Sequence, residues 1–526
     1  MRPADKFRFF LTFFLFFLYG ILISQKINLV TADLGRHIKN GEMILQVFDP
    51  EAQTRRGDTP QKVLGTNLYS YTFPEFPFLN HHWGGGVVLY LVHQVSGFVG
   101  ISIFFLIVSL VTLGLFFDVA RKKSNFETAF LVTLLLLPLI ADRVEIRPEI
   151  FSYLFCGIYL WILRGVRKVR KRLIILPFLQ LLWVNLHVYF FLGLFLIGVF
   201  LAEEILLFLK KKDSSDLKAI RDLSIALFLS ILASFLNPAG VKGLLYPFRI
   251  FGNYGYRILE NQTVWFLDKI IQYPPNLYFK IGFGLLLLSW IFVFRKRRKF
   301  SFANFILSIF ISYLGWTAVR NFTLFGLFAL PIVASNLNGV AMMKKNEDNI
   351  LKNFVISSLA VLIIFVLFLI NIPYWKTKGS LGLGLEKGVE KGAEFFKKEK
   401  LRGPIFNDYD NGGYLIYYLY PQEKIFVDNR PEAYPKEFFD KVYIPMQENE
   451  SVWVEVDKKY NFNTIFFHRL DLTPWSQTFL INRVSDPSWA PIYVDGYSII
   501  FVKRNEQNKE LIKKFELPKE MFSVTK

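Results

Sequence analysis

The 526-residue sequence contains a single cysteine, Cys156, which lies inside a run of apolar residues. No intrachain disulfide can form, so any exported part of the chain must be stable without one. The sequence also lacks the short motifs of several enzyme classes: it has no Walker phosphate-binding loop, no Gly-x-Ser-x-Gly, no His-Glu-x-x-His and no Cys-x-x-Cys. Nucleotide hydrolysis, serine hydrolysis and structural zinc are therefore without support.

Hydrophobic residues, by contrast, make up 53% of the sequence, include 58 phenylalanines and are concentrated in long runs. A helix that crosses ~30 Å of hydrocarbon needs about 20 such residues. The runs therefore predict an α-helical polytopic membrane protein with about 11 transmembrane helices. The predicted spans cover residues 7–24, 99–117, 127–141, 149–163, 173–185, 188–208, 222–236, 278–294, 301–317, 322–338 and 353–372.

The runs 173–185 and 188–208 are separated so briefly that they could form a re-entrant pair instead of two full spans. In that case Trp183, Asn185 and His187 could serve only to join two short helices.

The formal net charge is +19, but most basic residues stand in short clusters between apolar runs, where they indicate topology and not a nucleic-acid partner. With the N-terminus in the cytoplasm, every cluster falls on the cytoplasmic side, as the positive-inside rule requires. The first run is followed by no small-residue cleavage signal before Asp33, so we expect a retained anchor. The basic clusters are residues 121–123, 167–172, 210–212, 295–299 and 344–345.

This topology places the long loop 25–98 on the outer face, and its first part, residues 31–46, alternates polar and apolar residues with helical spacing. The pattern is typical of an amphipathic helix that lies in the membrane interface, with Asp33 at the N-cap position. A second interfacial helix is expected at 87–98, with the glycines at 84–86 as its hinge.

Many of the unusual polar residues gather on the same outer face, where ionisable groups at the membrane boundary are functional candidates by default. Besides Asp33, these candidates are Arg36, His37, His81, His82, Arg143, Arg147, His187 and Arg320.

Most of these candidates also have a structural interpretation. Asp33 could cap its helix, and Arg143 and Arg147 could anchor helix ends at lipid headgroups as readily as they could bind phosphate. Adjacent histidines often belong to an aromatic belt, and no third ligand is identifiable, so we assign no metal. Arg320 lies between apolar runs, where a charge needs a partner.

From residue 373 to 526 the composition becomes that of a soluble α/β domain. Strands are predicted at 403–407, 424–428, 464–468, 490–495 and 497–503, with helices at 385–400, 410–420 and 436–460. Asp428 and Arg430 follow a predicted strand and could form either a binding site or a salt bridge within the domain.

A carboxylate, several arginines and histidines on an external membrane surface suit the transfer of a group from a lipid phosphate. A phosphate leaving group departs as an anion, so arginines can stabilise its charge while one carboxylate accepts the proton of an incoming hydroxyl. A single acid-base residue is enough for this chemistry.

Several segments, in this order along nearly the whole chain, resemble bacterial polytopic proteins grouped with the GT-C-type glycosyltransferases. They are DLGRHIKNGE, SYTFPEFPFLNHHW, RPEIFSYLF, WVNLHV, NPAG, GPIFNDYDNGGYLIYYLYP and KIFVDNRPEAY.

The resemblance implies an inverting transfer of a sugar from a polyprenyl-phosphate donor to an envelope glycan, lipid or protein, outside the inner membrane of a bacterial cell. It implies that Asp33 is the general base. Relatives often carry an acidic pair where this chain has Asp33 followed by Leu34, so the participation of a divalent metal stays open.

Two other classes of protein are alternatives to a glycosyltransferase. A transporter or lipid flippase would usually show internal repeats and polar residues near the bilayer midplane. A non-catalytic envelope scaffold would tolerate the loss of Asp33.

Overall fold

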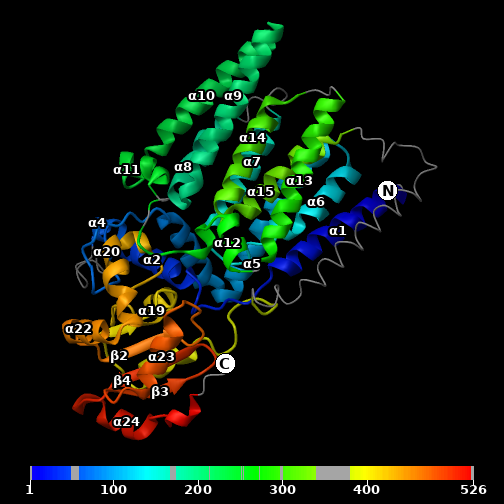
Figure 1. Cartoon of the computed structure of the whole chain (residues 1–526). Helices are drawn as coiled ribbons and strands as arrows, with labels where there is room; N and C mark the ends of the chain where they lie inside the picture. Colours follow the sequence, from blue (N-terminus) through cyan, green and yellow to red (C-terminus); the bar gives the residue numbers. More distant parts are fainter. Residues whose placement is uncertain are drawn as a thin grey trace.

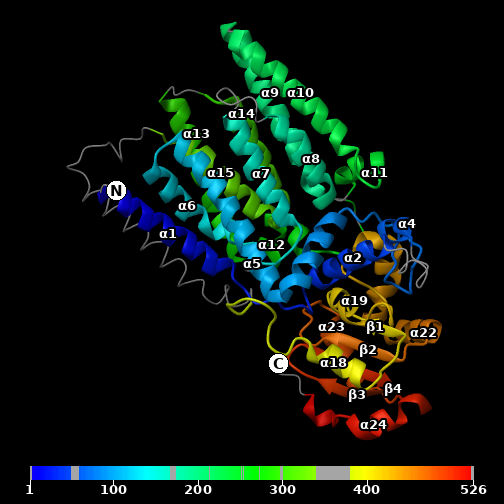
Figure 2. The same cartoon turned by 180° about the vertical axis from the view of Figure 1, so that it is seen from behind.

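The computed structural model describes residues 3–48, 59–165, 173–212, 214–249, 252, 254–271, 273–296, 300–338 and 379–522. Every predicted span within these residues is helical, and Figures 1 and 2 show the helices side by side in one helical body. Ten of the eleven predicted spans fall within the described residues. The eleventh, 353–372, lies outside the described residues, as do the basic clusters 167–172 and 344–345. The helices are α1 (Pro3–Ile23), α5 (Trp83–Lys123), α6 (Phe126–Ile140), α7 (Glu149–Arg164), α8 (Ile175–Leu186), α9 (Phe191–Lys211), α10 (Ser214–Ser234), α13 (Pro274–Arg295), α14 (Phe302–Thr317) and α15 (Phe322–Asn336).

The protein is a multi-pass membrane protein, although the count of about 11 spans is not confirmed. Among the described residues, 4 helical stretches are long and apolar enough to cross a membrane: Asp5–Ile23, Trp83–Lys123, Val188–Lys210 and Pro274–Arg295. Helix α8 has 12 residues and is about 18 Å long, which is shorter than the ~30 Å hydrocarbon layer.

The second interfacial helix is followed directly by the next span, and the two together make up α5, which has 41 residues and a kink between its two parts. The bend lies at Ser96 and Gly97, where Gly97 has φ of 61°, so the predicted hinge at the three glycines is wrong. Those glycines allow close packing instead: a Cβ on Gly86 would lie 2.8 Å from the carbonyl oxygen of His37, and one on Gly84 would lie 2.6 Å from that of Asn185.

The first interfacial helix is α2 (Leu34–Val47), and it packs between α5 and a helix of the C-terminal domain. The amphipathic pattern also allows a polar face that is exposed to solvent. In the structure, however, the polar residues Arg36, His37 and Asn40 of α2 are buried. The shorter elements of the helical body are α4 (Pro60–Gly65), α11 (Gly240–Leu245), α12 (Val264–Ile270), and the 3-10 turns η2 (Val188–Phe190), η3 (Tyr246–Phe248), η4 (Leu259–Asn261) and η5 (Val319–Asn321).

The C-terminal domain is a four-stranded sheet with helices around it, in the order β1-β2-β4-β3. β1 pairs with β2 in parallel, and the other two pairings are antiparallel. Four of the five predicted strands are present: β1 (Ile405–Asn407), β2 (Thr464–His468), β3 (Trp489–Val494) and β4 (Ser498–Lys503). The main helices are α18 (Lys391–Lys398), α19 (Gly412–Leu419), α20 (Lys436–Phe438), α21 (Pro445–Glu448), α22 (Glu450–Tyr460), α23 (Ser476–Ser485) and α24 (Lys509–Phe515).

The strand predicted at 424–428 is wrong. Ile425 forms an isolated bridge with Ser70, which belongs to the segment between α1 and α5. Ile425 exchanges backbone hydrogen bonds with Tyr69 and Tyr71, so the chain here joins the C-terminal domain to the helical body and not to its own sheet.

The two parts of the molecule also meet at α2 and α19 (Figure 2). A Cβ on Gly35 of α2 would lie 2.8 Å from the carbonyl oxygen of Gly413 on α19, so the two backbones nearly touch. This contact places the beginning of α2, and therefore Asp33, directly against the C-terminal domain.

Candidate active site

A cavity of about 460 Å³ lies where the helical body meets the C-terminal domain. The predicted site residues that line it are Asp33, Arg36, His37, His81, His82, Arg147, His187 and Arg320. They come from five separate parts of the chain, and the fold brings them together at one cavity. Arg143 does not line the cavity and lies behind its carboxylates.

Asp33 immediately precedes α2, but its side chain forms no capping hydrogen bond to the helix. Its Oδ2 atom lies 3.4 Å from Arg147 Nη1 and 4.0 Å from Arg36 Nη2. Its Oδ1 atom accepts a hydrogen bond from the side-chain amide of Asn429 in the C-terminal domain. The carboxylate therefore lies at the cavity between two guanidinium groups.

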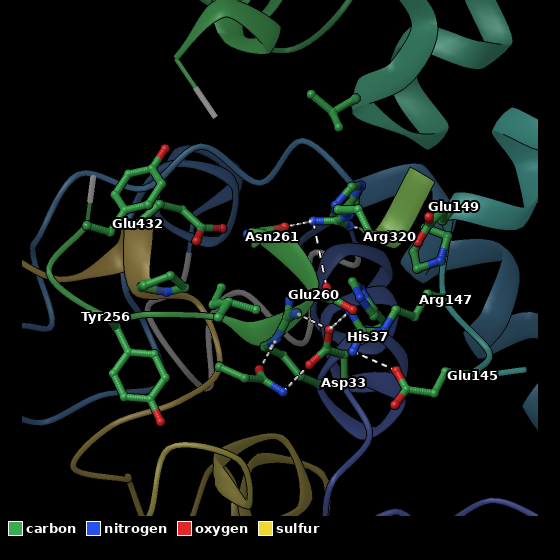
Figure 3. A pocket seen from close by; sticks show the side chains of 18 of the residues that line it. Asp33, His37, Glu145, Arg147, Glu149, Tyr256, Glu260, Asn261, Arg320 and Glu432 are labelled. Carbon is green, nitrogen blue, oxygen red and sulfur yellow. Dashed lines mark hydrogen bonds and ion pairs between the residues drawn. The ribbon is translucent and has the colours of Figure 1, made fainter. Parts of the chain in front are cut away.

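Arg147 lies between three carboxylates, as Figure 3 shows. Its guanidinium nitrogens are 2.6 Å from Glu145 Oε2, 2.9 Å from Glu260 Oε1 and 3.4 Å from Asp33 Oδ2. Burial opposes the charge of Arg147, but these carboxylates raise its pKa above the ordinary value, so the side chain stays charged.

Glu260, in η4, connects Arg147 to two further arginines. Arg143 Nη1 lies 2.7 Å from Glu260 Oε2, and Arg320 Nη1 lies 3.7 Å from Glu260 Oε1. Burial raises the pKa of Glu260, but Arg143, Arg147 and Arg320 outweigh burial and hold the pKa well below its ordinary value. Glu260 is therefore a fixed negative charge and not a proton carrier near neutral pH.

Arg320 has the partners that its apolar surroundings require. It donates a hydrogen bond of 3.0 Å to Asn261 Oδ1, and its Nη2 lies 3.8 Å from Glu149. Glu149 also pairs with Arg143 at 2.9 Å. Arg143 thus acts from behind the cavity, where it fixes Glu149 and Glu260.

Four histidines, His37, His81, His82 and His187, form a group of contacting rings that lines the cavity. The rings of His81 and His82 have centroids 3.9 Å apart, and those of His82 and His187 are 4.7 Å apart with 13° between their planes. Burial lowers the pKa of all four, to about 3 for His81 and His187 and well below the ordinary value for His37 and His82. The histidines are therefore neutral near pH 7.

The C-terminal domain completes the cavity with residues that the sequence did not single out. Asn429 donates to Asp33 and accepts a hydrogen bond of 3.0 Å from Arg36 Nε. Tyr409 stacks on Tyr256 with ring centroids 4.0 Å apart. Burial raises the pKa of Asp410 to about 7, and the carboxylates of Asp471, Asp33 and Glu145 add to the rise.

Glu145, Glu149 and Glu260 are also absent from the predicted site. Their signal was in the sequence, because arginines at a membrane boundary must be paired with acids on the same face. Asp428 and Arg430, on either side of Asn429, form a salt bridge within the C-terminal domain. Their side chains are buried and 2.6 Å apart.

The donor set does not fit a divalent metal ion. Such an ion needs several oxygens at about 2.0–2.6 Å from one centre. In this cavity the guanidinium of Arg147 occupies the space between Asp33, Glu145 and Glu260. No group of three or more His, Cys, Asp or Glu side chains within the described part of the chain has the arrangement of a metal site.

Comparison with solved structures shows that the fold is similar to that of an archaeal oligosaccharyltransferase. No protein-family model and no curated protein matches this chain. Among solved structures, the oligosaccharyltransferase AglB of Archaeoglobus fulgidus, in complex with an inhibitory peptide and a dolichol-phosphate, matches with a TM-score of 0.60 and 12% identity over 96% of this chain and 75% of the archaeal chain.

Two further structures of the Archaeoglobus fulgidus oligosaccharyltransferase match in the same way. One is tethered to an acceptor peptide containing an NVT sequon, with a TM-score of 0.54 and 11% identity over 88% of this chain and 69% of that chain. The other is a complex with Zn and sulfate, with a TM-score of 0.53 and 12% identity over 93% and 73% of the two chains. At these identities the likeness concerns the fold alone.

Proposed function

We propose that the protein is a membrane glycosyltransferase that transfers a sugar from a polyprenyl-phosphate donor to an acceptor outside the cytoplasm. The observation that carries this proposal is the position of Asp33, whose carboxylate faces a cavity lined by Arg36, Arg147 and Arg320. A base beside a group of fixed cations is what transfer from a lipid phosphate needs.

In this proposal the reaction is a single displacement. The acceptor hydroxyl attacks the anomeric carbon, its proton passes to Asp33, and the bond from that carbon to the phosphate oxygen breaks. The lipid phosphate leaves as an anion that needs no proton, and the guanidinium groups of Arg147 and Arg320 stabilise it. One displacement inverts the anomeric configuration.

The remaining cavity wall supports sugar binding. The Nδ1 atoms of His37 and His82 are buried and have no hydrogen-bond partner among the described residues. Neutral imidazoles can donate to or accept from sugar hydroxyls. The cavity volume of about 460 Å³ lies within the range typical of small-ligand sites.

The likeness to AglB, which was solved with a dolichol-phosphate, supports a lipid-linked donor and a membrane-bound site. The acceptor peptide of the archaeal enzyme makes a peptide one candidate acceptor besides a glycan or lipid. The positive-inside pattern supports a cytoplasmic N-terminus and a C-terminal domain outside the cytoplasm. The inner membrane of a bacterial cell is the location that the resemblance to bacterial GT-C-type proteins implies.

The decisive experiment measures sugar release from a labelled polyprenyl-phosphate donor in proteoliposomes. Asp33→Asn should abolish transfer while membrane insertion and thermal stability remain. The matched control is Asp268→Asn, which removes a carboxylate that pairs with Lys280 and does not line the cavity.

Full activity of Asp33→Asn would remove Asp33 from the mechanism. Lipid movement without sugar release in the wild type would favour the flippase alternative. Neither activity, together with binding of an envelope component by the C-terminal domain, would favour the scaffold.

A further inference from the structure

Eight charged side chains, Asp33 among them, pair with one another and balance in charge. The arginines 36, 143, 147 and 320 face the four carboxylates of Asp33, Glu145, Glu149 and Glu260. In a low-dielectric site a balanced group of this kind has no excess negative charge with which to attract a cation.

The central member of this group is Arg147. It is the one arginine of the four that contacts Asp33, Glu145 and Glu260 together, with nitrogen–oxygen distances between 2.6 and 3.4 Å. The other arginines approach from the outside: Arg143 reaches Glu260 from the side that faces Glu149, and Arg36 reaches Asp33 from α2. Figure 3 shows the three carboxylates directed toward one point, and the guanidinium of Arg147 is at that point.

We propose that Arg147 supplies the fixed positive charge that a divalent cation would otherwise supply between Asp33, Glu145 and Glu260, so that sugar transfer by this protein requires no divalent ion. Arg147 positions the Asp33 carboxylate and also keeps a positive charge toward the cavity, where the phosphate of the donor would lie. The claim that transfer needs no divalent ion rests on the proposed function, whereas the position of Arg147 among the three carboxylates does not.

Removal of this guanidinium should create a cation site. Three carboxylates would then face one unfilled space, and oxygen ligands of this kind bind Mn²⁺ and Mg²⁺. The test is Mn²⁺ binding to the purified full-length protein, measured from the loss of the free-ion signal in electron paramagnetic resonance.

Wild type should bind no Mn²⁺ at this site, and Arg147→Ala should bind one ion per chain. Glu145→Gln added to Arg147→Ala should weaken that binding at least about tenfold, because one ligand is lost. Arg147→Lys keeps a positive charge in place and should bind none, a result that a merely structural role for Arg147 does not predict.

The matched control is Arg143→Ala. It removes a guanidinium from the same group of charges but leaves Arg147 between the three carboxylates, so it should bind no Mn²⁺. If Arg147→Ala does not fold, Arg147→Gln is measured in its place and is held to the same result.

Stoichiometric Mn²⁺ binding by the wild type that Asp33→Asn abolishes would overturn the proposal, and so would a folded Arg147→Ala that binds none. In the transfer assay, wild type should keep its rate within about twofold in EDTA. A loss of about tenfold or more that Mg²⁺ restores would also overturn it. If no donor is turned over under any condition, the proposed function fails, and the Mn²⁺ measurements still decide the role of Arg147.

Discussion

Asn429 offers the sharpest test of whether the C-terminal domain takes part in the reaction. Its side chain donates to Asp33 and accepts from Arg36, so it holds the base and one cation in a fixed relation across the junction between the two parts of the molecule. Hydrogen bonds to charged groups contribute about 1.5–3 kcal/mol each. In Asn429→Ala both are lost while both charges remain.

A loss of about 1.4 kcal/mol of transition-state stabilisation lowers the rate tenfold. If one of these contacts acts in the transition state, Asn429→Ala should reduce transfer by about 10- to 100-fold. Because Asn429 touches the base and not the leaving phosphate, the effect should be on kcat more than on KM for the donor.

The assay is transfer from a labelled polyprenyl-phosphate donor in proteoliposomes, with Asn449→Ala as the matched control. Asn449 is an exposed residue of the same domain that caps α22 and lies outside the cavity. A folded Asn429→Ala enzyme that works within about twofold of the wild type would refute the view that the C-terminal domain orients Asp33.

Three further predictions follow from the same geometry. Gly35→Val should push α2 away from Gly413, destabilise the junction by about 1–3 kcal/mol and expose the C-terminal domain to proteases. The four buried histidines stay neutral in the folded protein, whereas the same histidines in the unfolded chain take up protons below pH 6.5. Lowering the pH from 7 to 5.5 should therefore reduce the free energy of unfolding by roughly 1 kcal/mol for each histidine. His82→Gln should make the thermal midpoint less dependent on pH over this range. Asp410 is the reverse case: its pKa is about 7 against an ordinary 3.8, so rising pH costs stability between these values, by up to about 4 kcal/mol, and Asp410→Asn should raise the thermal midpoint at pH 8 but not at pH 4.

The helical body was predictable because its signal is local. A run of apolar residues forms a helix wherever it packs, and each predicted span among the described residues is one. The errors concern contacts between distant segments. Residues 424–428 have the composition of a strand, but Ile425 pairs with Ser70, more than three hundred positions earlier in the chain. The glycines at 84–86 suggested a hinge because the sequence does not show that His37 and Asn185 pack against them.

The site was predictable to the extent that topology sorts residues by face. Placing the basic clusters inside was enough to gather Asp33, Arg147 and Arg320 on one side, and the structure brings them to one cavity. Which carboxylate pairs with which arginine depends on angstrom-scale packing, and no spacing in the sequence encodes it.

Residues 428–430 show why the contribution of the C-terminal domain was missed. The charges of Asp428 and Arg430 made these two residues candidates for a binding site. In the structure they are buried and pair with each other, and Arg430 also donates a hydrogen bond to Asn67. The uncharged residue between them points the other way and donates to Asp33. Because that salt bridge fixes the backbone on both sides of Asn429, a buried pair with no contact to the cavity still sets the direction of the one amide that reaches the base. Breaking the pair with Asp428→Asn should therefore impair transfer through Asn429, and combining it with Asn429→Ala should add less than the two separate losses predict.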